Sequence, residues 1–281
     1  MKEIEASLIS KIVAGLCKDA CYILPDDVLA ALKKAEKDEE SPVGKETLHV
    51  LVENARIAVD EKLPLCQDCG VAVIFLEVGQ DVHIVGGDLN KAISDGVKQG
   101  YAEGYLRKSV DAHPYTEREN TGDNTPPVIH TTIVPGDKLR ISVMPKGAGS
   151  ENMCALFMLV PGDSREGVVR TVVKAVEDAG GKPCPPLVLG VGVGGMADNV
   201  MVMARHALLR KLGEPSKNPD NAALEKEILK RVNDLGIGPL GFGGRVTALA
   251  VHVESMPTHI ACMPVAVAFQ CHSARHKEAV I

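Results

Sequence analysis

Three cysteines far apart in the sequence have similar surroundings and could hold a metal cluster. Cys66 lies in LPLCQDCG, Cys184 in GKPCPPLV and Cys271 in FQCHSARH, each where a loop meets an apolar run. Thiolates held singly on turns stiffened by proline suit an iron–sulfur cluster, because each iron takes a sulfur ligand from a different direction. Three protein ligands leave one iron of a four-iron cluster open to act as a Lewis acid. Buried structural cysteine is the alternative interpretation at this point.

Two shorter motifs favour other chemistry, but both are incomplete. Cys66 and Cys69 form a C-x-x-C that could be redox-active or half of a zinc site, yet no second closely spaced pair follows. The run GVGVGG fits a dinucleotide fingerprint on Gly190, Gly192 and Gly195. That fingerprint needs a second strand ending in Asp or Glu about 20 residues later, where this chain has a polar linker. Close packing of a helix on a glycine-rich strand is the alternative.

Polar residues near the thiols in sequence could bind or activate a small anion. Gln67 and Asp68 follow Cys66 directly, and Arg107 ends an expected helix. Lys146 opens a glycine-rich loop, KGAGSEN, whose N–H groups could meet an anion. His259 lies three residues before Cys262. Each of these taken singly is more often a surface or capping residue.

Composition excludes several classes of protein. Hydrophobic residues make up 45% of the 281 and charged residues 24%, which indicates a folded chain with a substantial core. The net charge of −6 and the 3% of aromatic residues argue against a nucleic-acid partner. No run of about 18 apolar residues indicates a membrane span. The first residues read as an amphipathic helix instead of a signal peptide, so we expect a cytoplasmic protein whose eight cysteines form no disulfide framework.

Hydrophobic periodicity and turn residues predict a mixed α/β or α+β fold. We expect a helical subdomain over residues 1–62 and a mixed α/β region over residues 63–281. The predicted helices are 4–22, 26–37, 45–61, 88–108, 164–179, 197–212 and 221–235, and the predicted strands are 71–78, 184–195, 245–253 and 260–269. Residues 128–134 and 138–144, around Pro135-Gly136-Asp137, are predicted to form a hairpin.

Six motifs in this order carry a resemblance to a known family. They are LPLCQDCG, NTGDNTPP, KGAGSEN, CPPLVLGVGVGG, LGIGPLGFGG and THIACMPVAVAFQCHSARH. Together they resemble the class I (iron–sulfur) fumarate hydratase and tartrate dehydratase family, in its alpha subunit or N-terminal region, over about residues 10–281. The resemblance implies the fold of the iron–sulfur hydro-lyases and a [4Fe-4S] cluster held by three cysteines, with the fourth iron meeting substrate.

The resemblance also implies roles for individual residues. The cluster cysteines of the family correspond to Cys66, Cys184 and Cys271. Its substrate contacts correspond to Gln67, Asp68, Arg107 and Gly149, and its active-site histidine to His259. We expect Asp68 and His259 to orient or relay protons, and the Lys146 loop to attract a dicarboxylate together with Arg107. Many members carry Thr where this chain has Cys69, which adds a thiol beside the expected cluster.

The expected function is that of an alpha subunit. Single-chain members of the family continue into a C-terminal region that supplies further Arg and Lys side chains and a proposed Thr base, and this sequence ends at Ile281 without it. We therefore expect a beta subunit to complete the site, and an alpha chain that homodimerises within a heterotetramer. The leading hypothesis is reversible hydration of fumarate to (S)-malate, a step of the tricarboxylic acid cycle. The alternatives are an L-tartrate dehydratase alpha subunit and, from another class, a non-catalytic cluster-binding or thiol-redox protein.

Overall fold

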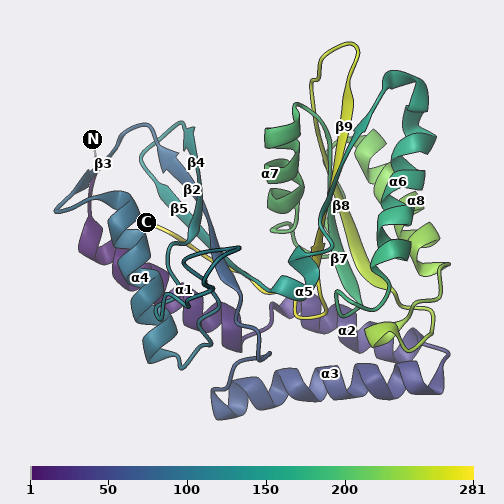
Figure 1. Cartoon of the computed structure of the whole chain (residues 1–281), viewed down its shortest axis with the longest axis horizontal. Coiled ribbons are helices and arrows are strands. Elements are labelled where there is room, and N and C mark those ends of the chain that lie inside the picture. Colours follow the sequence, from purple (N-terminus) through teal and green to yellow (C-terminus); the bar gives the residue numbers. More distant parts are fainter. Residues whose placement is uncertain (1) are drawn as a thin grey trace. The chain divides into compact units, whose positions relative to one another are not determined.

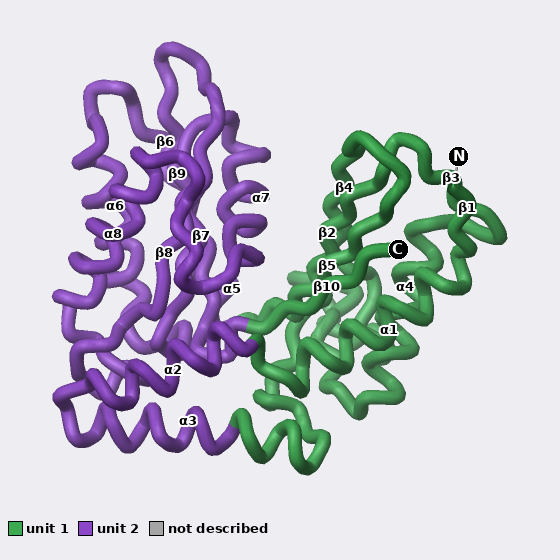
Figure 2. The backbone as a smooth tube through the Cα atoms, turned by 180° about the vertical axis from the view of Figure 1, so that it is seen from behind, with its two compact units in different colours: residues 1–25, 55–148, 275–281 green, residues 26–54, 149–274 purple. Residues whose placement is uncertain are grey.

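The chain crosses between two units four times, so each unit is assembled from separate stretches of sequence. A computed structural model describes residues 2–281. Unit 1 comprises the residues up to 25, residues 55–148 and residues 275–281, and unit 2 comprises residues 26–54 and 149–274 (Figure 2). The sheets contain parallel and antiparallel strand pairs and are covered by helices, which confirms the predicted α+β class.

Unit 1 packs two helices against a four-stranded sheet. The sheet has the order β10 (Lys277–Val280), β5 (Leu139–Lys146), β2 (Val71–Gly79), β4 (Val128–Val134), and β1 (Lys2–Glu5) pairs with β3 (Val82–Val85) beside it. Helix α1 (Ala6–Tyr22) lies on α4 (Leu89–Glu103) (Figure 1). Their backbones approach closely because α4 has glycine at the contact: a Cβ on Gly96 would lie 2.5 Å from the Ser10 carbonyl oxygen.

The predicted hairpin of β4 and β5 is wrong, because β2 lies between these two strands. Strand β2 pairs in parallel with β4 and antiparallel with β5. The reason is burial: β2 is almost wholly apolar and buried over most of its length, so it occupies a central position with a neighbour on each edge, whereas β4 is largely exposed. The residues between β4 and β5 bond to the end of β2, where the Gly79 N–H donates to the Lys138 carbonyl at 2.8 Å.

Unit 2 is a four-stranded sheet with helices on both faces. Its order is β6 (Ala155–Leu159), β9 (Met263–Gln270), β7 (Leu187–Gly194), β8 (Ala248–Met256), with β7 parallel to β8 and antiparallel to β9. Helices α6 (Ser164–Ala179) and α8 (Pro219–Asn233) cover one face and α7 (Ala197–Ala207) covers the other (Figure 1).

The glycines of the GVGVGG run serve this packing. A Cβ on Gly190 would lie 2.0 Å from the Ala204 carbonyl oxygen of α7, and one on Gly192 would lie 2.5 Å from the Val200 carbonyl oxygen. Helix α7 therefore rests directly on the backbone of β7, while Leu187, Leu189 and Val191 point into the core beneath α6 and α8.

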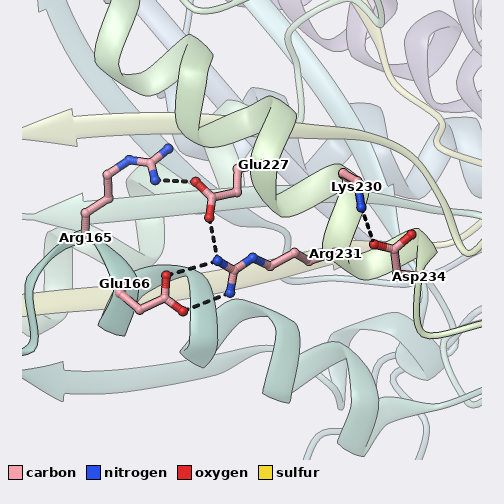
Figure 3. Close-up of polar contacts among 6 residues, drawn as sticks. All are labelled: Arg165, Glu166, Glu227, Lys230, Arg231 and Asp234. Carbon is pink, nitrogen blue, oxygen red and sulfur yellow. Dashed lines mark hydrogen bonds and ion pairs between the residues drawn. The ribbon is translucent and has the colours of Figure 1, made fainter.

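Exposed ion pairs join the two outer helices of unit 2. Arg231 donates both terminal nitrogens to the Glu166 carboxylate at 2.8 and 3.0 Å, and a third bond reaches Glu227 of its own helix at 2.7 Å (Figure 3). Arg165 completes the cluster by donating to Glu227. These groups are accessible to solvent, so the ion pairs add little to the stability of the fold.

Helices α2 (Asp26–Asp38) and α3 (Pro42–Glu61) do not form a separate helical subdomain with α1. Helix α1 belongs to unit 1, whereas α2 contacts β8 of unit 2 and α3 passes from unit 2 into unit 1 after Asn54. The units thus divide the chain differently from the boundary expected between residues 62 and 63, because helix packing and not chain order decides the grouping. Nowhere in residues 2–281 does a helix combine the length and apolarity needed to span a bilayer.

Candidate functional site

Cys184 and Cys271 lie at the same end of the unit 2 sheet. Cys184 comes shortly before β7 and Cys271 directly follows β9, and these strands are antiparallel neighbours with Val188 opposite Gln270. The two loops are bonded, because the His272 N–H donates to the Cys184 carbonyl at 3.1 Å. Cys184 is exposed and Cys271 is partly exposed. Two cysteines far apart in sequence are therefore held in adjacent loops with accessible sulfur atoms.

The backbone at Cys184 is strained. Its φ of 56° lies in the left-handed region, which a non-glycine residue rarely adopts, and its N–H closes a turn onto the Gly181 carbonyl at 3.1 Å. Such strain persists only where the surrounding structure imposes it, and it concentrates at functional sites. The turn thus holds the Cys184 thiol in one accessible position.

Gly149 lies beside this turn. It is the second residue of the short helix α5 (Ala148–Glu151), and a Cβ placed on it would lie 3.4 Å from the Lys182 carbonyl oxygen. Glu151 of the same helix forms an ion pair with Arg205 of α7, which ties α5 to the sheet. In unit 2 the structure therefore brings together three of the predicted site residues, namely Gly149, Cys184 and Cys271.

The Cys66–Asp68 turn forms a second group in unit 1. Asp68 accepts the Gly70 N–H on one carboxylate oxygen at 2.9 Å and the Ala148 N–H on the other at 2.8 Å. Its own N–H donates to the Cys66 sulfur at 3.4 Å. The thiol of Cys66 is partly exposed and Gln67 is exposed. Asp68 thus ties the turn that carries two predicted site residues to the start of α5.

A buried arginine that the sequence reasoning missed strengthens the same turn. Arg275 is only 3% exposed, and its guanidinium donates to the carbonyl oxygens of Asp68 and, at 3.3 Å, Pro145. Nothing in its sequence neighbourhood distinguished it from a surface residue, because its partners lie far along the chain. Lys146, expected in an exposed loop, is the last residue of β5 and is only 4% exposed.

Arg107 belongs to the group in unit 1. It follows the end of α4 by a few residues, its side chain is exposed, and its backbone N–H donates to the Cys69 sulfur at 3.2 Å. The hydrogen bond from Cys21, together with the Arg107 N–H and the Arg275 charge, lowers the pKa of Cys69 to about 6 against the opposing effect of burial. By contrast, burial alone raises the pKa of Cys17 to about 12, as expected of an inert core thiol.

His259 lies at the opposite end of the unit 2 sheet from Cys184 and Cys271. It is in the connection between β8 and β9, beyond the pairing of Gly194 with Met256 (Figure 1). Strand β9 runs the length of the sheet from this connection to Cys271, which is about 25 Å at about 3.4 Å per residue. The imidazole is exposed, and its Nδ1 accepts the Ala261 N–H at 3.1 Å. The structure therefore does not gather His259 with the two cysteines of its own chain.

The accessible thiols of Cys184 and Cys271 are donors that suit a thiophilic metal. Across residues 2–281, no three His, Cys, Asp or Glu side chains form a group that could hold a metal ion by themselves, and no cysteine in that range is in a disulfide. The two cysteines of unit 2 thus offer two thiol groups, and a cluster would need a further donor.

The fold and these loops define a class: an α+β protein whose accessible cysteines sit at strand ends beside polar, glycine-rich turns. The model of the fumarate hydratase (Fumerase) family matches residues 10–280, and the chain belongs to this family.

Relatives cover nearly the whole chain. A protein of Methanocaldococcus jannaschii named putative L(+)-tartrate dehydratase subunit alpha is 43% identical over 95% of both chains. The L(+)-tartrate dehydratase subunit alpha of Escherichia coli strain UTI89 is 32% identical over 98% of this chain and 91% of its own length. The protein of the same name in Escherichia coli strain K12 is 31% identical over the same shares.

Proposed function

We propose that this chain is the alpha subunit of a [4Fe-4S]-dependent hydro-lyase that acts on a small dicarboxylate. The observation that carries the proposal is the pairing of Cys184 and Cys271 in bonded, accessible loops at one end of a sheet. Membership of the family and the names of the relatives support it. The cytoplasmic location stays a prediction from the sequence.

Cys66, Cys184 and Cys271 would hold the cluster. All three thiols are at least partly exposed, whereas Cys17, Cys21 and Cys69 are buried in the core. The cluster would supply a Lewis acid that polarises the leaving hydroxyl group. Cys262 lies in the connection between β8 and β9 with His259, so it is at the wrong end of its sheet to join Cys184.

The other residues of the chain would bind and orient the substrate. The exposed guanidinium of Arg107 suits a carboxylate, and Gln67 and the Gly149 backbone offer further hydrogen bonds. Lys146 adds positive charge from its buried position at the end of β5. Asp68 contributes by orientation, because both of its carboxylate oxygens accept backbone N–H groups that fix the loops on either side.

The position of His259 supports a homodimer of alpha chains. Because it lies a full strand length from Cys184 and Cys271, we propose that it enters the site of a second copy and orients or relays a proton there. A beta subunit supplies the base that removes the C3 proton, giving a heterotetramer. The names of the relatives, which call them alpha subunits, support the need for a second kind of chain.

Two substrates are proposed, and the comparisons favour different ones. Reversible hydration of fumarate to (S)-malate agrees with the family description. Dehydration of L-tartrate agrees with the names of the relatives. Dehydration of (S)-malate, which is the reverse of fumarate hydration, and dehydration of L-tartrate both remove water from a dicarboxylate and could use the same residues. The substrate is therefore decided by assay at fixed enzyme concentration.

The test is anaerobic reconstitution with iron and sulfide, followed by quantification of both and assays of fumarate and L-tartrate with and without the beta subunit. Cys184→Ser and Cys271→Ser are expected to lose most of the bound iron and the activity. Cys262→Ser is the matched control and should retain both. Equal iron contents in the three variants, or a wild-type chain that binds no iron, would refute the proposal. Loss of function in Cys69→Ser with iron retained would instead favour a thiol-redox protein.

A further inference from the structure

Cys69 contacts the segment that carries Arg107 through two separate groups. Its sulfur accepts the Arg107 N–H at 3.2 Å, and its carbonyl oxygen accepts the Tyr101 hydroxyl at 2.8 Å. The side chain is only 1% exposed, in the core between α1 and β2. Cys69 also follows the Cys66–Asp68 turn directly, so one residue joins that turn to the chain between α4 and Arg107.

The backbone around Arg107 lies outside regular secondary structure and is held by individual hydrogen bonds. After Arg107, the Lys108 carbonyl accepts the Asn120 side-chain amide at 3.1 Å, and the Ser109 N–H donates to the Asn124 side-chain oxygen at 2.7 Å. Helix α4 ends at Glu103, Tyr105 has a φ of 48° and is 90% exposed, and no regular element begins before β4. Leu106 anchors the segment, since it is 1% exposed and its N–H donates to the Tyr101 carbonyl at 3.0 Å. At Arg107 itself the Cys69 sulfur accepts the backbone N–H, so this bond contributes to the direction in which the exposed side chain leaves the backbone.

The surroundings of Cys69 make the sulfur a good acceptor that does not move. Tyr101 is fully buried and bonds both the Cys69 and the Gly70 carbonyl oxygens, and Asn124, also fully buried, donates to the Gly70 carbonyl at 3.1 Å. A Cβ on Gly70 would lie 2.6 Å from the Lys146 backbone, so this turn cannot shift towards β5. A buried hydrogen bond between rigid groups orients what is attached to it.

We infer that Cys69 is a positioning residue: its sulfur fixes the Arg107 backbone so that the guanidinium stands beside the Cys66–Asp68 turn, ready for a substrate carboxylate. This inference rests on the proposed function. Cys69 touches neither the substrate nor the cluster in this role and acts only through Arg107. Loss of the bond should therefore weaken substrate binding more than turnover.

The experiment compares variants of Cys69 in the reconstituted alpha–beta complex. Cys69→Ala removes the acceptor, Cys69→Val removes it while filling the space, and Cys69→Ser retains an acceptor. Losing one hydrogen bond that holds a binding residue should raise KM for the dicarboxylate about 5- to 10-fold in Cys69→Ala and Cys69→Val, with kcat within about twofold. Cys69→Ser should restore KM to within about threefold of wild type. Cys17→Ala, which removes another fully buried thiol, is the control and should leave KM unchanged.

Amide hydrogen exchange of the alpha chain provides a readout independent of activity. The Arg107 N–H should be protected in wild type, Cys69→Ser and Cys17→Ala, and should exchange at least about 10-fold faster in Cys69→Ala and Cys69→Val. If the wild-type complex turns over and the two acceptor-free variants keep a normal KM or a protected Arg107 amide, the inference is overturned and the proposed function stands. If the wild-type complex neither hydrates fumarate nor dehydrates L-tartrate, the proposed function is refuted, and the inference, which rests on it, is refuted as well.

Discussion

Two inactive alpha-chain variants should restore activity to each other if His259 serves the site of a second copy. The perturbation is co-expression, with the beta subunit, of His259→Ala and Cys184→Ser chains. The length of β9 places His259 about 25 Å from Cys271, far beyond the reach of an imidazole side chain. Each site must then combine the cysteines of one alpha chain with the histidine of the other.

The expected magnitude follows from counting sites. Random pairing makes half of the dimers hybrids, and a hybrid has one site with both the intact histidine and the intact cysteine, and one site with neither. The mixture should therefore reach about a quarter of wild-type activity, although each variant alone has almost none. Hybrids purified through two different affinity tags should reach about half.

The assay is the initial rate of fumarate hydration or L-tartrate dehydration. Preparations are matched for iron content per chain, and only the Cys184→Ser chains, which are expected to lack cluster, are left out of this matching. A mixture that remains at the sum of its two components would refute the shared site, because hybrids then contain no intact site. High activity of His259→Ala alone would show that this histidine is not needed in either copy. Co-expression of two differently tagged His259→Ala chains is the control for expression effects.

Three further predictions concern stability. Gly190→Ala should destabilise unit 2 by about 2–4 kcal/mol in urea unfolding, because its Cβ would overlap the α7 backbone, whereas Gly15→Ala, with open space around it, should be neutral or stabilising by up to about 1 kcal/mol. Burial, followed by a nearby arginine charge, lowers the pKa of His252 to about 4 from the usual 6.5. Below about pH 6.5 the unfolded chain therefore binds more protons than the folded chain, and about 3 kcal/mol of stability should be lost as the pH falls from about 6.5 to 4. In His252→Asn, urea midpoints should not show this fall of stability with pH. The same pH dependence in the variant and in wild type would refute the assignment to His252. Arg275→Met should lower the unfolding free energy by about 2–3 kcal/mol and speed alkylation of the Cys66 thiol. Arg118→Met, at an exposed ion pair, is the control and should change the unfolding free energy by less than about 1 kcal/mol. Equal changes in the two variants would show that burial of Arg275 is unimportant.

Long periodic elements of the fold could be predicted from the sequence. Helices α1, α2, α3, α6 and α8 lie within a few residues of their predicted bounds, because each presents a continuous apolar face over at least three turns. Strands β1, β3, β6 and β10 were missed, because four or five residues give too short a pattern to distinguish from a loop. The hairpin failed for a different reason: two strands joined by a good turn signal were separated by a more apolar strand that the turn signal could not reveal.

Some features of the candidate site can be recognised from short stretches of sequence, and others depend on contacts between residues far apart in the chain. The cysteines, the exposed Arg107 and the loop at Gly149 were found from residue types and motifs. The bonds of Cys69 to Arg107 and of Arg275 to Asp68 were not, because each links residues far apart in sequence and neither residue has a distinctive neighbourhood. Buried polar contacts of this kind need the topology before they can be predicted.

The topology of one sheet explains why Cys184 and Cys271 lie together and why His259 lies apart from them. Cys184 precedes β7 and Cys271 follows its antiparallel neighbour β9, so the two must meet at one end of the sheet. His259 precedes β9, and the same argument places it at the other end. His259 is closer to Cys271 in sequence than Cys184 is, but the eight residues of β9 separate His259 from Cys271 along the sheet. In the proposed homodimer, the direction of β9 is the reason that His259 would serve the site of a second alpha chain instead of the site of its own.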